Sequence, residues 1–220
     1  MTSPTDPPTQ DRAATGHPEA SQPGVPKPGV PKPGAIVLAR HGEPALSRRL
    51  KLDARGYDRW WATYEAGGIL EGQTPPQELI DQARQAGVVF ASIRPRAIET
   101  ARAVVGDKAV RQDPMFIEAP LPAPCTPRFV KLSPKTWGVV SRFLWWFGYH
   151  RGQETRRQAQ DRARAAAERL IGEALSGQDV LVLAHGFFNG MVGVELSRRG
   201  WRCVQDRGFK YWATRRFERE

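Results

Sequence analysis

The chain has few cysteines and no long hydrophobic run, and these two absences exclude several classes of protein. Only Cys125 and Cys203 occur among its 220 residues. Two cysteines without metal-ligand spacing exclude a framework of several disulfides, so we expect two free thiols in a reducing, cytoplasmic environment. No apolar stretch approaches the length needed to cross a bilayer, and no secretory signal pattern is present. We therefore expect a soluble cytoplasmic protein that is not inserted in a membrane.

Acidic residues are also scarce relative to basic ones. The chain has 33 Lys and Arg against 23 Asp and Glu, which gives a formal net charge of +10. An excess of positive charge attracts anions of every kind without choosing among them. The composition therefore predicts an anionic partner or substrate, which could be a phosphate ester, a nucleic acid or an acidic membrane surface.

Proline and glycine are concentrated at the beginning of the chain. Residues 1–34 are rich in both, and the sequence Pro-Gly-Val-Pro-Lys at positions 23–27 is repeated at 28–32. Such a segment has too few apolar side chains to form a core. We expect residues 1–34 to be a disordered tail and residues 35–220 to form one domain.

Within residues 35–220, short apolar runs alternate with amphipathic segments. Buried strands are expected at 35–39, 88–91 and 180–184, a weaker strand near Val110, and an edge strand within 209–217. Helices are expected at 77–86, from 95 or 96 to 105, at about 155–175, and after Gly186. This alternation is typical of the α/β class and predicts a three-layer α/β/α sandwich with a mainly parallel sheet.

Two longer stretches interrupt this alternation and resemble insertions over a site. One covers residues 50–74, and the other is an aromatic-rich insertion at about 119–153. In the second, Trp137, Val140, Leu144 and Phe147 recur at helical spacing, which favours a packed cap helix. A lid that contacts substrate and an interfacial helix at a membrane remain open as alternatives.

Two of the expected strands end in a histidine followed by glycine. Residues 36–39 lead into Arg40-His41-Gly42, and residues 180–184 lead into His185-Gly186. In an open α/β sheet, ligands bind at the carboxyl ends of the strands, so the two histidines can converge on one site. Glycine lets the backbone approach an anion closely, and the predicted ligand is a phosphoryl group.

Further motifs between these histidines carry a resemblance to a known family. Ser92, Arg96-Ala97 and Thr100-Ala101 match the pattern Ser-x-x-x-Arg-Ala-x-x-Thr-Ala, and Glu118 follows in Phe116-Ile117-Glu118. Together with Arg40-His41-Gly42 and His185-Gly186, they make residues 35–217 similar to the histidine phosphatase superfamily, also called phosphoglycerate mutase-like. The resemblance implies the phosphoglycerate mutase-like fold.

The resemblance also implies roles for individual residues. His41 would form the phosphohistidine, because a neutral imidazole is a nucleophile and nearby cations disfavour its protonation. Arg40, Arg96 and His185 would bind the phosphoryl group, and the helix after Gly186 would add its amino-terminal dipole. Glu118 would act as general acid and then as general base. Other acidic residues remain open for that last role, namely Glu71, Glu99 and Glu154.

These residues favour a metal-independent phosphatase that hydrolyses a phosphomonoester and needs no cofactor. The expected substrate is a phosphorylated small molecule, with an apolar group if the aromatic insertion contacts it. One alternative is a phosphoglycerate mutase-type isomerase, although the surroundings of Glu118 depart from the usual mutase pattern. Another is a non-catalytic basic module that binds phosphate or nucleic acid, although the chain has no nucleic-acid motif. The substrate and the oligomeric state are not predicted.

Overall fold

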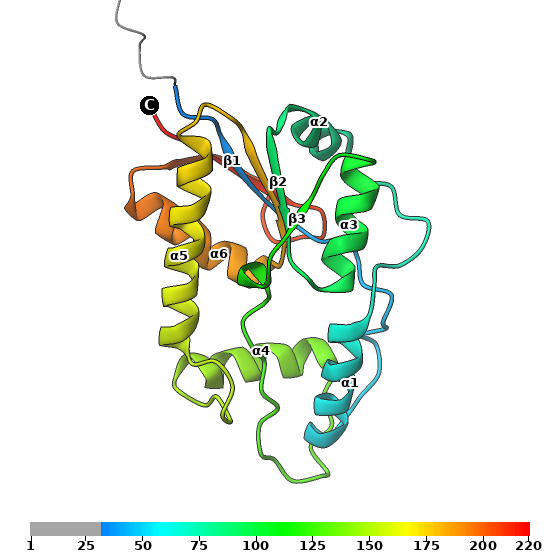
Figure 1. The fold of residues 1–220 in the computed structure, drawn as a ribbon. Coiled ribbons are helices and arrows are strands. Elements are labelled where there is room, and N and C mark those ends of the chain that lie inside the picture. The colour runs from blue at the N-terminus through cyan, green and yellow to red at the C-terminus, as the bar shows by residue number, and fades with distance from the viewer. Residues whose placement is uncertain (1–31) are drawn as a thin grey trace, which may run out of the picture. The chain divides into compact units, whose positions relative to one another are not determined.

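A six-stranded mixed sheet lies at the centre of residues 32–220, the part of the chain that the computed structural model describes (Figure 1). Its order is β3-β2-β4-β1-β6-β5. Strand β4 pairs in parallel with β1 and β2, and β2 with β3, whereas β6 pairs antiparallel with β1 and β5. The strands are Ile36–Arg40 (β1), Val88–Ala91 (β2), Arg111–Gln112 (β3), Val180–Ala184 (β4), Arg202–Asp206 (β5) and Thr214–Glu218 (β6).

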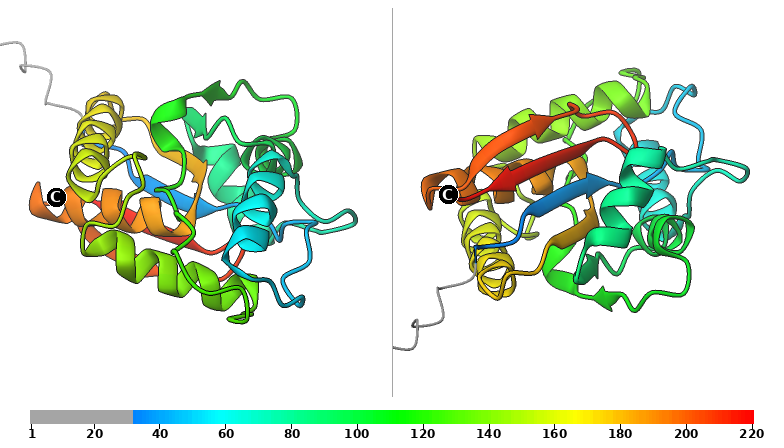
Figure 2. Two further views of the ribbon diagram at one scale, coloured as in Figure 1. Left: turned by 90° about the horizontal axis from the view of Figure 1, so that it is seen from below. Right: turned by 90° about the horizontal axis from the view of Figure 1, so that it is seen from above.

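Helices cover both faces of this sheet (Figure 2). Arg156–Ala174 (α5) and Gly186–Arg198 (α6) pack on one face, and Gln77–Gln85 (α2) and Pro95–Val105 (α3) pack on the other. Successive residues of a strand point to opposite faces, so Ile36 packs toward α5 and α6 while Val37 packs toward α2 and α3. The predicted three-layer α/β/α sandwich is therefore confirmed, and the observed helices and parallel strands lie close to the expected ranges.

The C-terminal region differs from its prediction. The expected edge strand within 209–217 is β6, which is an inner strand between β1 and β5. The edge strand on that side of the sheet is β5, which the sequence pattern did not predict. Its residues alternate between exposed and half-buried, and a bulge lies between Cys203 and Gln205. An edge strand that buries neither face carries little apolar periodicity, so its signal in the sequence is weak.

The two predicted insertions form a cap at one end of the sheet (Figure 1). Each contains a helix, Ala54–Ala66 (α1) and Pro134–Trp146 (α4), and Tyr57, Trp60 and Trp137 are buried together in a core between them. The indole Nε1 of Trp137 donates to the carbonyl of Leu52 over 2.7 Å. The sequence analysis did not predict α1, because its aromatic residues alternate with charged ones.

The burial of α4 confirms a packed cap helix but corrects which residues face inward. Trp137, Ser141 and Trp145 are buried. Phe147 was expected on the packed stripe, but the helix ends at Trp146 and 73% of Phe147 is exposed. Of the residues that the sequence analysis placed on the packed side of this helix, Trp137 is therefore correct and Phe147 is wrong.

Three further sequence predictions concern the termini, the thiols and the membrane. Cys125 is exposed, Cys203 is half-buried, and both are free, as predicted. The predicted tail at 1–34 falls outside the described residues except for positions 32–34. Within residues 32–220, no helix combines the length and the apolar character that a membrane crossing requires.

Candidate active site

The two strand-end histidines lie side by side. His41 follows β1 and His185 follows β4, and these two strands are parallel neighbours in the sheet. The ring centroids are 5.2 Å apart, with an angle of 64° between the ring planes. Both side chains are buried. Residues separated by 144 positions in the sequence therefore present two imidazoles to one point at the carboxyl edge of the sheet.

The hydrogen bonding of His41 fixes which ring nitrogen is free. Its Nδ1 lies 2.7 Å from the carbonyl oxygen of Gly42. Because a carbonyl only accepts, Nδ1 carries the proton and the lone pair is on Nε2. Burial, followed by the charges of Arg96 and Arg40, holds the pKa of His41 well below its ordinary value. His41 is therefore a neutral imidazole at neutral pH, with a free lone pair on Nε2.

His185 is held by a residue from a third strand end. Its Nε2 lies 2.8 Å from the hydroxyl of Ser92, which follows β2. Burial, then the charges of Arg96 and His41, keep the pKa of His185 well below its ordinary value. Within residues 32–220, its Nδ1 is buried and has no hydrogen-bond partner. A buried polar atom of this kind is available to a ligand.

The glycines that follow the histidines have a packing role that the sequence analysis did not foresee. A Cβ on Gly42 would lie 2.4 Å from the indole of Trp212, and one on Gly186 would lie 3.2 Å from Cδ of Arg40. The N–H of Gly42 donates to the hydroxyl of Thr100 over 2.9 Å. The structure therefore gives both glycines a packing reason, the close approach of Trp212 to Gly42 and of Arg40 to Gly186.

Two arginines surround the histidines. Arg96 is only 1% exposed, and its Nη2 pairs with Oε1 of Glu65 over 2.7 Å. The guanidinium of Arg40 lies 4.4 Å from the ring centre of Tyr211 and donates to the carbonyl of Phe209. In both arginines Nε is buried and has no partner among residues 32–220. Both can therefore donate further hydrogen bonds to an anion.

Glu118 is bound to the amino terminus of α6. Its Oε1 accepts from the N–H groups of Phe188 (2.9 Å) and Ala119 (3.0 Å), and Oε2 accepts from the N–H of Phe187 over 3.2 Å. An ionised carboxylate at a helix amino terminus is favourably placed. The sequence analysis assigned this terminus to the phosphoryl group, but two of its amides are bound to Glu118.

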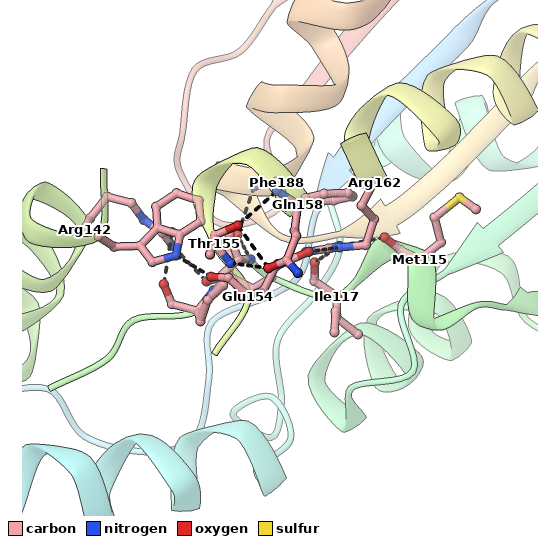
Figure 3. A network of polar contacts seen from close by, with 12 residues as sticks. Met115, Ile117, Arg142, Glu154, Thr155, Gln158, Arg162 and Phe188 are labelled. Atoms are coloured by element: carbon pink, nitrogen blue, oxygen red, sulfur yellow. Dashed lines mark hydrogen bonds and ion pairs between the residues drawn. The ribbon is translucent and has the colours of Figure 1, made fainter. Parts of the chain in front are cut away.

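A polar network around Arg162 and Glu154 holds the segment just before Glu118 (Figure 3). Arg162 of α5 donates from Nη1 to the carbonyls of Met115 and Ile117, each over 2.8 Å. Its Nη2 pairs with Glu154 over 2.7 Å. This arrangement attaches the segment before Glu118 to α5, so the carboxylate has a defined position.

The other carboxylates considered from the sequence lie outside the cavity that holds Glu118. Glu154 pairs with Arg162, and Glu99 accepts from the N–H of Ile69 over 2.7 Å. Glu71 is exposed. Glu118 is therefore the candidate acid that shares a cavity with the histidines.

That cavity has a volume of about 280 Å³ and contains all five predicted site residues, Arg40, His41, Arg96, Glu118 and His185. A larger hollow of about 700 Å³ contains none of them and lies beside Cys125. The cap supplies the opposite wall of the smaller cavity. The cap residues in that wall include Trp60, Trp61, Tyr64, Leu121, Lys135, Val139 and Arg142, and Arg48, just before the first insertion, lines the same wall.

Sequence reasoning missed the cationic residues of this wall. Arg48 donates to the hydroxyl of Tyr64 over 2.6 Å, and its Nε is buried without a partner in the described part of the chain. Arg142 donates to the carbonyls of Ala119 and Pro120, and its guanidinium lies 3.8 Å from the ring centre of Phe187. Burial lowers the pKa of Arg142. The one available signal was the presence of basic residues inside, or just before, the two aromatic insertions.

Neutral imidazoles, several guanidinium groups and one carboxylate can together bind a tetrahedral dianion and exchange protons with it. Among the described side chains, no group of three or more His, Cys, Asp or Glu is arranged to bind a metal ion. The imidazoles, guanidinium groups and carboxylate therefore offer nucleophilic and acid–base chemistry.

Comparisons with known proteins give the family. Residues 36–209 match the family model of the histidine phosphatase superfamily (branch 1). A phosphoglycerate mutase from Bacillus anthracis has a similar structure, with 16% identity, a TM-score of 0.54, and coverage of 85% of this chain and 88% of the mutase. A phosphoserine phosphatase from Entamoeba histolytica, solved as a mutant with phosphoserine, has 15% identity, a TM-score of 0.50, and coverage of 75% and 80%.

At such identities, the two structures support the fold, which they share with this chain. A search of curated proteins found no match. The family model covers most of the chain and includes both histidine motifs. The protein therefore belongs to the histidine phosphatase superfamily.

Proposed function

We propose that this protein is a metal-independent phosphatase that hydrolyses a phosphomonoester through a phosphohistidine on His41. The observation that carries the proposal is the state of His41: a buried, neutral ring with its proton on Nδ1 and its lone pair on Nε2. Arg40, Arg96 and His185 line the same cavity. A nucleophile among cations, with a fixed free nitrogen, suits attack on phosphorus.

In the first half of the reaction, Nε2 of His41 attacks phosphorus, and the bond to the ester oxygen breaks. Negative charge remains on the three equatorial oxygens throughout this transfer. The free Nε–H groups of Arg40 and Arg96 supply donors for these oxygens. Nδ1 of His185 is a further partner, as a donor when that nitrogen carries the ring proton.

Glu118 handles the protons in both halves of the reaction. As general acid it protonates the departing oxygen, and as general base it then takes a proton from the water that attacks phosphohistidine. Its Oε2 accepts a single long bond from Phe187 among the described residues, which leaves a lone pair for this proton. The backbone bonds to Oε1 keep the carboxyl group in one orientation.

A phosphate-release screen tests this function. Sugar, nucleotide, aryl and lipid-like phosphates and phosphohistidine peptides are each given to the purified protein, with His41→Ala and the matched variant His150→Ala alongside. His150 does not line the cavity. We expect release that His41→Ala abolishes and His150→Ala retains, and that a chelator does not change.

Three results would contradict the proposal. One is the absence of release from every ester, and another is release that survives in His41→Ala. The third is transfer of the phosphoryl group within 3-phosphoglycerate at a rate above hydrolysis, which would make the protein a mutase-type isomerase. Salt-dependent oligonucleotide binding without phosphate release would instead favour the non-catalytic module.

A further inference from the structure

The outward side of the cap helix α4 is apolar and uncovered in the described structure. Val139 is 66% exposed, Phe143 64% and Phe147 73%, and Trp146 beside them is also exposed. The rings of Phe143 and Phe147 are 4.8 Å apart. We call these four residues the α4 outer face. Neighbouring exposed aromatic side chains on one helix are typical of an interaction surface.

The sequence around this face is strongly basic. Residues 127–157 contain one acidic residue, Glu154, which is paired with Arg162. The same residues contain seven Lys and Arg, of which five are exposed: Arg128, Lys131, Lys135, Arg151 and Arg157. Phe129, between two of these cations, is 83% exposed. In the sequence, this apolar face therefore has cations on both sides and a single acidic residue among them, a composition that complements a surface both apolar and negatively charged.

A second copy of this chain fits the face less well. In a two-fold symmetric dimer the same patch meets itself, so the flanking cations of one copy would lie near those of the other. Like charges brought together in this way oppose association. A nucleic acid would match the charge, but a row of Phe and Val side chains along a helix offers it no phosphate contacts.

The α4 outer face adjoins the mouth of the candidate active site. Val139 belongs to the face and also lines the cavity. The exposed Lys135, one turn earlier in the helix, lines the cavity too. Phe209, which is also exposed, lies in the wall of the same cavity. Whatever the face binds therefore lies next to the opening through which a substrate enters.

We propose that the α4 outer face docks on anionic lipid bilayers, with the aromatic side chains in the interfacial layer and the surrounding cations against lipid headgroups. The helix has the features of an interfacial segment, since it combines exposed Trp and Phe with adjacent Lys and Arg. Docking in this orientation places the cavity mouth at the membrane surface.

Vesicle co-sedimentation of the full chain tests this proposal. The probes are vesicles of phosphatidylcholine alone and of phosphatidylcholine with phosphatidylglycerol, at low and high salt. We expect binding to the anionic vesicles that falls with salt, and at least roughly a tenfold loss in the double variant Phe143→Ser/Phe147→Ser. The control Leu175→Ser removes an exposed apolar side chain at the far end of α5 and should bind normally.

Charge variants provide a second test that does not depend on the aromatic side chains. Arg128→Glu/Lys131→Glu changes two exposed side chains and should weaken binding to anionic vesicles. Thermal melting, together with hydrolysis of any soluble ester that the wild type accepts, verifies that each variant is folded. Neither Phe143 nor Phe147 lines the cavity, so that hydrolysis should persist.

Several outcomes would overturn the proposal. The wild type could fail to bind anionic vesicles, or bind neutral vesicles equally well. Binding that both double variants retain would also contradict it. Concentration-dependent dimerisation that Phe143→Ser/Phe147→Ser abolishes, without vesicle binding, would assign the face to a second copy. Vesicle binding is measured without turnover, so its result stands whether or not the phosphatase proposal does.

Discussion

The sheet and the cap contribute opposite kinds of surface to one cavity. The sheet edge presents His41, His185 and Arg96, all buried and each fixed by a hydrogen bond to a neighbouring group. The cap side presents Arg48, whose guanidinium lies 5.0 Å from the ring centre of Tyr64, and Trp61, which packs against the aromatic cluster; both are half-exposed. Fixed polar groups suit the reacting phosphoryl group, and a wall of aromatic and cationic side chains suits the rest of a substrate. We therefore propose that the sheet side carries out the chemistry and that the cap recognises the rest of the substrate.

The two regions also use carboxylates differently. At the sheet edge, Glu118 is bound by backbone amides and Arg162 fixes the segment before it. In the cap, Glu65 pairs with both Arg94 (2.8 Å) and Arg96 (2.7 Å). Glu65 therefore orients Arg96 from the cap side, whereas Glu118 is held by the amino terminus of α6. Substitutions on the two sides should accordingly change different kinetic constants.

After the loss of His41 itself, the largest effect is expected from Arg96→Met. Removing this buried guanidinium takes away a donor to the transferring phosphoryl group, and kcat should fall by about 10³-fold. The decrease in kcat is measured by steady-state hydrolysis of an aryl phosphate. Arg94→Met is the matched control, because Arg94 shares Glu65 but does not line the cavity. Equal losses in both variants would show that the ion pair matters for folding alone.

Glu118→Gln should have the next largest effect. A glutamine cannot donate or accept the transferred proton, so hydrolysis of alkyl phosphates should slow by roughly 10²-fold. Aryl phosphates, whose leaving groups need less protonation, should slow less. Glu99→Gln, which changes a carboxylate outside the cavity, is the control. A uniform loss for all leaving groups would remove Glu118 from proton transfer.

A smaller effect is expected in the cap. Arg48→Met should lower kcat/KM by about tenfold, mainly through KM, because a binding contact is lost without a change in the reacting groups. The control is Arg49→Met, which changes the exposed arginine next to Arg48. If Arg48→Met instead lowers kcat alone, the cap takes part in the chemistry and the division between sheet and cap is wrong.

The buried histidines also predict how stability depends on pH. Folding lowers the pKa of His41 and of His185, so below pH about 6.5 the unfolded chain binds more protons than the folded one. The free energy of unfolding should therefore fall as pH falls, by up to about 1.4 kcal/mol per pH unit for each histidine. Urea denaturation between pH 5 and 7 measures this slope in the wild type and in His41→Asn, where it should be shallower. Identical slopes would mean that His41 is not buried in its neutral form.

The sequence predicted the sheet side of the site better than the cap side, for a physical reason. His41 and His185 each follow a continuous apolar run, and the carboxyl ends of parallel strands meet by the geometry of the fold. Arg96 lies in a short motif at the start of a helix that follows a buried strand. Local pattern and fold class together were enough to bring these residues to one edge.

The cap could not be predicted in this way. Whether Arg48 reaches the cavity depends on how α1 and α4 pack, and that packing comes from Tyr57, Trp60 and Trp137, whose partners are distant in sequence. Glu65 appears as one charge among many on a helix until Arg96 is placed against it. The role of Gly42 likewise depends on Trp212, 170 residues later. Long-range packing of this kind leaves no local signal.

Trapping the covalent intermediate tests the central claim most directly. The protein is mixed with a substrate found in the release screen, quenched at alkaline pH during turnover, digested and analysed by mass spectrometry. We predict a phosphoryl adduct on the peptide that contains His41, labile to acid, and absent from His41→Ala. Turnover with no adduct, or with the adduct on another residue, would contradict the phosphohistidine mechanism.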